Sequence, residues 1–287
     1  MVELSLGFSG ILKGKQACSA TKSVGLARAW WTDFDSGQLH SRYMCETRNL
    51  TLLLLYWPVL LLLGILAIEL LSGQLTGGTL LQKHLVRKSF HALAISLFLP
   101  PLMWGQQNFL ALSQLVASIL LIALEVCRVS RAPLSQLQDR YLAKYLDKRE
   151  DISKDLLLTH LYLLLGCSLP VWLEMSMRHP NPLRSCSGVL LIGVGDSCAA
   201  LLGIRFGRRR WPNSQRTFMG TAGFLMSISL VVFVLFSTID HWQSSLLAAA
   251  LTALLEVYTT SIDNLALPLF FCALHKSMEP WLQWLQG

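Results

Sequence analysis

Charged residues are scarce in this chain of 287 residues. They make up 14% of the sequence, whereas 53% of the residues are hydrophobic. In an ordinary soluble domain about a quarter of the residues are charged. The composition excludes a disordered protein, and long apolar blocks between short charged loops exclude an ordinary soluble domain. We therefore expect an all-α, polytopic integral membrane protein.

Common metal-binding and nucleotide-binding motifs are also missing. The seven cysteines form no CxxC pair and no Cys/His ligand spacing, which argues against a zinc site or a disulfide framework. Neither the GxxxxGK[ST] P-loop nor the GxGxxG fingerprint occurs. The net charge of +7 comes from basic residues in loops between apolar segments, where such residues usually set membrane topology. No nucleic-acid partner is expected.

About eight apolar segments are long enough to predict transmembrane helices. The clearest one covers residues 50–71. The others cover about 89–104, 109–126, 156–173, 185–204, 220–239, 245–262 and 265–284. This pattern predicts a polar leader of unassigned role, residues 1–49, and one membrane-embedded domain, residues 50–287.

Two of these segments contain residues that disturb a regular helix. Pro100 and Pro101 interrupt the second segment, and Gly193, Gly195 and Asp196 lie in the fifth. Broken helices in membrane proteins line cavities, because only there can their backbone groups find partners. We expect some of the helices to be broken.

An arrangement of eight spans places three basic loops on one side of the membrane. Loops 72–88, 127–155 and 205–219 carry fifteen Lys and Arg residues, against three in the opposite loops and at the C-terminus. The positive-inside rule assigns the basic side to the cytosol. The turn at Asp263 and Asn264 falls on this same side.

Ionisable residues inside apolar segments are the first candidates for chemistry, because charges are costly in a bilayer. We single out Asp196, Glu256 and His160 within these segments, together with Asp263 in the turn that follows one of them. Glu256 and Asp263 are seven residues apart and would share one face of a continuous helix. Carboxylate oxygens suit a hydrated divalent cation, so the three acidic residues are predicted metal ligands. The structural alternatives are a helix cap for Asp196, an ion pair for Glu256 and a core position for His160.

The stretch of residues 193–220 combines glycines with basic residues. Its glycines permit close backbone approach, and arginine forks match phosphate oxygens. The arginines are Arg205, Arg208, Arg209, Arg210 and Arg216. We predict that this stretch binds a polyphosphate beside a metal ion. The alternative is small-residue helix packing followed by a basic loop that sets topology.

A third cluster comprises Arg87, Lys88 and His91 at the start of the second segment. Arg87 and His91 are four residues apart and would share a helical face. They could meet phosphate there, and His91 could help to move a proton. A charge cluster at the membrane boundary is the alternative.

Four motifs in the same order resemble those of dolichol kinases, CTP-dependent enzymes of the polyprenol kinase group. They are RKSFH, LLTHLYLLLGCSLPVWL, GVGDSCAALLGIRFGRRRWPNSQRTFMGT and LLEVYTTSIDNLALPLF. The resemblance is to the C-terminal catalytic half of these enzymes and covers about residues 80–275. The wider similar group includes CTP-dependent diacylglycerol kinases.

This resemblance implies transfer of the CTP γ-phosphate to the hydroxyl of dolichol, with Mg²⁺ or another divalent cation. The product, dolichyl phosphate, would serve protein glycosylation at the endoplasmic reticulum membrane, with the active site facing the cytosol. Positions that match the family motifs are Arg87, Lys88, His91, Gly195, Asp196, Thr217, Gly220, Glu256, Thr260, Asp263 and Asn264.

Together, these considerations assign roles to three sets of residues. The catalytic set is Asp196, Asp263 and His91, and the metal ligands are Asp196, Glu256 and Asp263. The nucleotide-binding set is Arg87, Lys88, Gly195, Gly203, Gly207, Arg208, Arg209, Arg210, Arg216, Thr217, Gly220 and Asn264.

The chain departs from the family pattern in two places. The family commonly has Lys-Thr-x-Glu-Gly where this chain has Arg216 to Gly220, with Met219 in place of the glutamate. Dolichol kinases of animals and fungi also usually carry a long N-terminal membrane region that this sequence does not show. Open alternatives are a kinase for another lipid alcohol such as diacylglycerol, a catalytically impaired pseudokinase, and a small transporter that uses Asp196 and Glu256.

Overall fold

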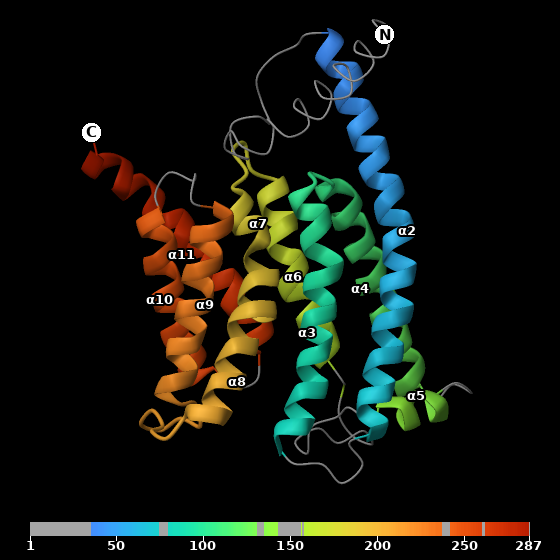
Figure 1. The fold of residues 1–287 in the computed structure, drawn as a ribbon, viewed down its shortest axis with the longest axis vertical. Coiled ribbons are helices and arrows are strands. Elements are labelled where there is room, and N and C mark those ends of the chain that lie inside the picture. The colour runs from blue at the N-terminus through green and yellow to red at the C-terminus, as the bar shows by residue number, and fades with distance from the viewer. Residues whose placement is uncertain are drawn as a thin grey trace, which may run out of the picture.

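The fold is helical throughout the part of the chain that the structure describes. The computed structural model describes residues 36–74, 80–130, 135–142, 156, 158–236, 242–259 and 262–286. Within these ranges the single β-type pairing is an isolated bridge between Arg210 and Thr217. Long helices run side by side up and down the molecule (Figure 1). The prediction of an all-α protein is confirmed.

Each predicted apolar segment forms a helix or a column of helices. The elements are α2 (Ser36–Gln74), α3 (Leu80–Met103), α4 (Gln107–Val129), α5 (Ser135–Leu142), α6 (Thr159–Met175), α7 (Pro182–Gly188), the π-helix η1 (Val189–Gly195), α8 (Asp196–Phe206), α9 (Phe218–Phe236), α10 (Trp242–Tyr258) and α11 (Asp263–Gln286). The column α7–η1–α8 corresponds to the fifth predicted segment.

The boundary expected between residues 49 and 50 falls inside α2. This helix begins at Ser36 and continues through the boundary. No proline between Ser36 and Pro58 interrupts it, and the polar residues before the apolar run are mostly compatible with a helix. The polar leader and the membrane domain are therefore joined by one continuous helix.

Among the residues that the structure describes, four helical segments are long and apolar enough to cross a membrane by length and composition. They are Thr47–Leu71, Gln107–Val129, Pro182–Phe206 and Phe218–Leu235, and the apolar helix Gln243–Tyr258 is shorter. Large apolar side chains such as Leu62 and Leu112 are exposed along α2 and α4, as expected for surfaces that contact lipid tails. The chain is a multi-pass membrane protein.

The Pro100-Pro101 pair does not break α3, contrary to one expectation from the sequence. Two prolines remove two N–H donors, so the carbonyls of Ser96 and Leu97 lose their helical partners. Side chains of α2 replace them: Tyr56 Oη donates to the Ser96 carbonyl and Trp57 Nε1 to the Leu97 carbonyl, both at 3.0 Å. These two bonds satisfy the freed carbonyls and tie α2 to α3.

The fifth segment does deviate from α-helical geometry, as predicted. Its middle is the π-helix η1, which ends immediately before Asp196. A Cβ atom on Gly193 would lie 2.3 Å from the Ile95 side chain, and one on Gly195 would lie 2.8 Å from the Phe224 ring. Glycine at these positions lets α3 and α9 pack directly against the π-helix.

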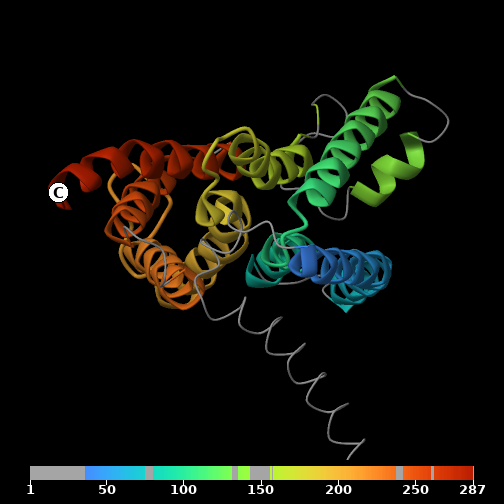
Figure 2. The ribbon, with the colours of Figure 1, turned by 90° about the horizontal axis from the view of Figure 1, so that it is seen from above.

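The central column organises the bundle. Contacts from α3, α6, α7, α9 and α11 surround η1, and all of its residues except Val194 are buried. Seen from above, α9 and α10 lie on one side of this column, and α2, α4 and α5 lie on the other (Figure 2). The α8–α9 loop, the end of α10, the start of α11 and the start of α3 lie at the same end of the bundle (Figure 1).

Candidate functional site

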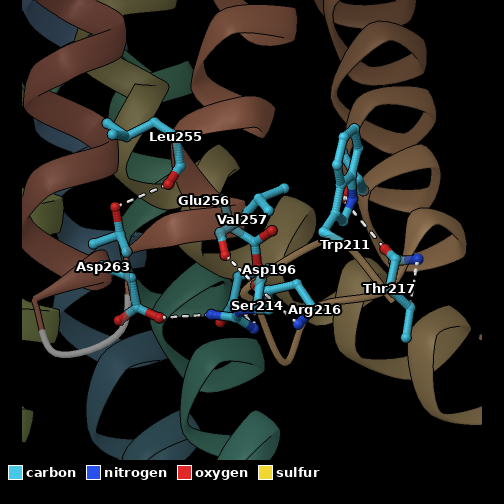
Figure 3. A network of polar contacts seen from close by, with 12 residues as sticks. Asp196, Trp211, Ser214, Arg216, Thr217, Leu255, Glu256, Val257 and Asp263 are labelled. Carbon is cyan, nitrogen blue, oxygen red and sulfur yellow. Dashed lines mark hydrogen bonds and ion pairs between the residues drawn. The ribbon is translucent and has the colours of Figure 1, made fainter. Parts of the chain in front are cut away.

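Three carboxylates from three helices converge at this end of the bundle. Asp196 begins α8, Glu256 lies in the last turn of α10 and Asp263 begins α11. Arg216 contacts all three (Figure 3). Its Nη1 lies 3.0 Å from Glu256 Oε1 and 4.0 Å from Asp196 Oδ1, and its Nη2 donates to Asp263 Oδ2 at 3.0 Å. One guanidinium therefore links the starts of α8 and α11 with the end of α10.

Glu256 and Asp263 meet by a different route from the one their spacing predicted. The sequence placed them on one face of a continuous helix, but the chain leaves the helical path after Tyr258 and α11 begins at Asp263. They come from two helices and are joined through Arg216.

Helix α3 contributes a second cation and a histidine. Lys88 Nζ forms an ion pair with Asp196 Oδ2, and His91 Nδ1 lies 3.5 Å from the same oxygen. His91 Nδ1 is also 3.1 Å from the Ile192 carbonyl of the π-helix, to which a protonated Nδ1 donates. Asp196 thus lies between the Lys88 cation of α3 and the guanidinium of Arg216, and its side chain is only 10% exposed.

A tight hairpin between α8 and α9 positions Arg216. The Trp211 N–H donates to the Arg216 carbonyl at 3.0 Å, and the Arg216 N–H donates to Ser214 Oγ at 3.1 Å. Ser214 Oγ in turn donates to the Val257 carbonyl at 2.5 Å. Since Val257 follows Glu256 in α10, this contact anchors the hairpin directly beside the carboxylate that Arg216 meets.

The glycines of this segment pack α8 against α9. The N–H of Gly220 donates to Thr217 Oγ1 at 3.1 Å, at the start of α9. A Cβ atom on Gly207 would lie 2.6 Å from this hydroxyl, one on Gly203 would lie 3.0 Å from it, and one on Gly220 would lie 3.0 Å from the Ala199 carbonyl. Protein atoms fill the space beside each glycine, which is the packing role that the sequence left open as the alternative to phosphate binding.

The five arginines of this stretch divide into two groups. Arg216 faces the carboxylates, whereas the side chains of the other four are exposed. Within the described part of the chain, no ion pair joins Arg208, Arg209 or Arg210 to an acidic residue. These three arginines lie in the hairpin without reaching the carboxylate cluster, so they offer positive charge to something outside the bundle.

Some predicted residues lie elsewhere or outside the description. The His160 ring packs edge-on against Phe90 at 5.8 Å in the contact between α6 and α3. The Asn264 N–H donates to Asp263 Oδ1 at 2.9 Å. Thr260 and the side chain of Arg87 fall outside the described residues.

The three carboxylates form a cluster with Lys88 and Arg216. This cluster is unbalanced in charge and largely shielded from water. Lys88 and Arg216 oppose three carboxylates. Asp263, which precedes the predicted span 265–284, is the most exposed of the three acids at 25%. Burial raises the pKa of its carboxyl above the usual range, the negative charge of Asp196 adds to the rise, and Arg216 opposes it. Such a cluster can hold phosphate oxygens through its cations and take up a proton through a carboxylate.

Carboxylate oxygens are the right donors for Mg²⁺, but their arrangement does not form a ready metal site. Among the described residues, no three His, Cys, Asp or Glu side chains lie close enough together to hold one metal ion. Asp196, Glu256 and Asp263 approach a common guanidinium instead of a common point.

Comparison with known proteins identifies relatives that match two thirds or more of the chain. The chain is 33% identical to human dolichol kinase over 251 residues, which is 81% of this chain and 46% of that protein. It is 32% identical to dolichol kinase EVAN of Arabidopsis thaliana over 232 residues, 77% of this chain and 39% of that protein. With dolichol kinase sec59 of Schizosaccharomyces pombe it shares 32% identity over 200 residues, 67% of this chain and 39% of the relative.

This chain is a homologue of the dolichol kinases. The resemblance predicted from its four motifs is confirmed, and the chain spans less than half the length of these relatives. No family profile matches the chain. No solved structure matches it either.

Sequence reasoning missed two residues that shape the site of this dolichol kinase homologue. Ser214 links the hairpin to α10, and Trp211 stacks on Phe218 with ring centroids 4.1 Å apart while its Nε1 donates to Thr221 Oγ1 at 3.0 Å. Only their position between the arginines could have drawn attention to them, since no periodic pattern predicts a contact between a loop and a distant helix end.

Proposed function

We propose that this dolichol kinase homologue transfers the γ-phosphate of CTP to the terminal hydroxyl of dolichol. The observation that carries the proposal is the cluster of Lys88, Asp196, Arg216, Glu256 and Asp263 at one end of a membrane-spanning bundle. The relatives' names support dolichol as the acceptor and phosphate as the transferred group. CTP as the donor is supported by the resemblance of the motifs.

The transfer replaces one bond to phosphorus with another. The dolichol hydroxyl oxygen bonds to the γ-phosphorus, the bond from that phosphorus to the bridging oxygen breaks, and CDP leaves. Lys88 and Arg216 neutralise charge on the phosphate oxygens. The hydroxyl proton passes to a carboxylate. Asp263 is suited to accept it because it is the most exposed acid of the cluster and burial raises its pKa above the usual range of an aspartate.

Asp196 is proposed to be essential because every cation of the site meets it. It pairs with Lys88, lies 3.5 Å from His91 and lies 4.0 Å from Arg216. Without this carboxylate, the cations of Lys88 and Arg216 would lose the negative charge that lies between them in a largely buried position. Asp196 therefore keeps the phosphate-binding groups close together before a substrate arrives.

The exposed arginines of the hairpin are proposed to receive the nucleotide. Arg208, Arg209 and Arg210 lie in the same α8–α9 hairpin as Arg216, and their side chains are exposed. We expect them to attract the polyphosphate from solution. Mg²⁺ or another divalent cation, bound to the nucleotide phosphates, would neutralise part of their charge, and Asp196, Glu256 and Asp263 are the carboxylates that would meet it.

The membrane supplies the second substrate. A polyprenol alcohol is confined to the bilayer, so a site at the end of a transmembrane bundle allows its hydroxyl to approach from the side while CTP approaches from water. The loops at this end carry most of the basic residues, which supports an orientation toward the cytosol. We place the protein in the endoplasmic reticulum membrane, where dolichyl phosphate would serve protein glycosylation.

The test is phosphate incorporation from γ-labelled CTP into dolichol by membranes that contain the chain. Unmodified chain is expected to label dolichol in preference to diacylglycerol offered at the same concentration. Asp196→Asn is expected to abolish the labelling. Asp139→Asn is the matched control, because Asp139 pairs with Arg128 at 3.5 Å, away from the cluster. Undiminished labelling by Asp196→Asn would refute the assignment of the site, and preferred labelling of diacylglycerol would refute the assignment of the substrate.

A further inference from the structure

The guanidinium of Arg216 lies where the three carboxylates converge. Its Nη1 reaches Glu256 and Asp196, and its Nη2 reaches Asp263. Oxygen ligands of Mg²⁺ lie about 2.0–2.1 Å from one central ion, which requires them to gather around a point. Here the carboxylate oxygens lie at different nitrogens of the planar Arg216 guanidinium, at distances of 3.0–4.0 Å.

The charge of the cluster depends on this one side chain. Three carboxylates face Lys88 and Arg216, which leaves one formal negative charge with His91 neutral. Glu256 is 2% exposed, and its ion pair within the cluster is the one with Arg216 at 3.0 Å. Loss of the guanidinium would leave two formal negative charges in a largely buried position, and buried charges without partners are strongly unfavourable.

The backbone holds Arg216 in this position. The N–H and the carbonyl of Arg216 are both hydrogen-bonded within the hairpin, and Ser214 ties the hairpin to Val257 at the end of α10. A long surface side chain would lose rotamer freedom on pairing with a single acid. Arg216 instead extends from an anchored backbone and meets three acids at once, so its position is part of the folded structure.

We propose that Arg216 is a built-in counter-ion that takes the place of a divalent cation in the cluster. In the absence of nucleotide, the chain then binds no divalent cation at Asp196, Glu256 and Asp263. A cation reaches these carboxylates only together with phosphates, whose negative charges give Arg216 an alternative partner. The identity of that nucleotide rests on the proposed phosphotransfer. Exclusion of the cation can be measured without any nucleotide.

The test uses Mn²⁺ as a paramagnetic substitute for Mg²⁺. The purified chain in lipid nanodiscs is titrated with Mn²⁺ in the absence of nucleotide, and the decrease of the free-ion electron paramagnetic resonance signal reports binding. We expect the unmodified chain to have no Mn²⁺ site at these carboxylates, so that Asp263→Asn leaves its Mn²⁺ binding unchanged. Arg216→Gln is expected to gain one Mn²⁺ site that binds at least about tenfold more tightly than any Mn²⁺ binding by the unmodified chain, because the positive charge 3.0–4.0 Å from the three carboxylates is removed.

Two further variants locate the effect. Adding Asp263→Asn to Arg216→Gln is expected to abolish the new site. Arg209→Gln removes an exposed arginine of the same hairpin that forms no ion pair with the described acids of the cluster, and it should behave like the unmodified chain. If Arg216→Gln does not fold, Ser214→Ala is the second variant, since loosening the hairpin should also increase Mn²⁺ binding.

Two results would overturn the proposal. The first is an Mn²⁺ site in the unmodified chain that Asp263→Asn removes, because Arg216 would then not exclude the cation. The second is no gain of binding in either Arg216→Gln or Ser214→Ala, because the guanidinium would then not be what prevents it. Neither result involves phosphate transfer, so failure of this inference is distinguishable from failure of the proposed kinase activity.

Discussion

The hydrogen bond from Tyr56 to α3 should contribute to the free energy of unfolding only because α3 contains prolines. Tyr56 Oη donates to the Ser96 carbonyl at 3.0 Å, and that carbonyl lacks a helical donor because the residue four positions later is Pro100. Tyr56→Phe removes the hydroxyl and keeps the ring. Pro100→Ala restores an N–H that can donate to the same carbonyl. We predict that the second change cancels the cost of the first.

The expected magnitude follows from the membrane environment. Removing the hydroxyl leaves one carbonyl without a donor, and hydrogen bonds between membrane helices contribute about 0.6–2 kcal/mol. Tyr56→Phe should therefore destabilise the protein by about 1 kcal/mol in the native background. In the Pro100→Ala background the carbonyl keeps a helical donor, so the same substitution should cost close to nothing, and the coupling energy should be about 1 kcal/mol.

The assay is reversible unfolding of the four proteins of this cycle in mixed micelles. Trp172→Phe provides a control for loss of an aromatic donor, since Trp172 Nε1 donates at 3.2 Å to the Ala111 carbonyl, which has no proline four residues later. Its cost should be the same with and without Pro100→Ala. An equal cost of Tyr56→Phe in both backgrounds would refute the reasoning that links the tyrosine to the proline.

Three further changes test the packing and the charges. Glu174→Gln should lower the free energy of unfolding by about 3–5 kcal/mol, measured by the same unfolding assay, because it removes the carboxylate charge of a buried ion pair with Arg184; a loss below 1 kcal/mol would contradict this. Gly207→Ala should cost about 1–3 kcal/mol, since the new Cβ would lie 2.2 Å from the Gly203 carbonyl, and an unchanged melting temperature would contradict the packing role. Arg209→Gln should raise the KM for CTP severalfold and leave kcat nearly unchanged in steady-state labelling, because the side chain is exposed; a fall confined to kcat would place Arg209 at the reacting phosphate instead.

The helices could be predicted from the sequence because long apolar runs have few alternatives in a membrane. Each backbone polar group must find a partner within lipid, and an α-helix provides one for nearly every residue. The same argument failed at Pro100 and Pro101. The partners of their freed carbonyls are side chains 40 residues earlier, and such distant donors leave no signal in the local pattern.

The chemistry of the site was predictable by residue type but not by contact. Burial costs identified Asp196, Glu256 and Asp263 before their positions were known. The sequence could not separate Arg216 from the other arginines of its stretch, because composition and spacing treat all of them alike. Their division depends on the hairpin, and the hairpin depends on a bond from Ser214 to the end of another helix.

Two sites in this bundle pair a carboxylate with a guanidinium, and the two pairs have different roles. Glu174 and Arg184 form a two-point ion pair at 2.6 and 3.1 Å, and their side chains are 3% and 4% exposed. At the other cluster, Arg216 and Asp263 remain 31% and 25% exposed. A carboxylate and a guanidinium that are sealed from water can only hold helices together, since a ligand would have to unfold the bundle to reach them. A carboxylate and a guanidinium that remain partly exposed to solvent can exchange each other for another ionic partner. A site that binds and releases phosphate requires such an exchange of partners.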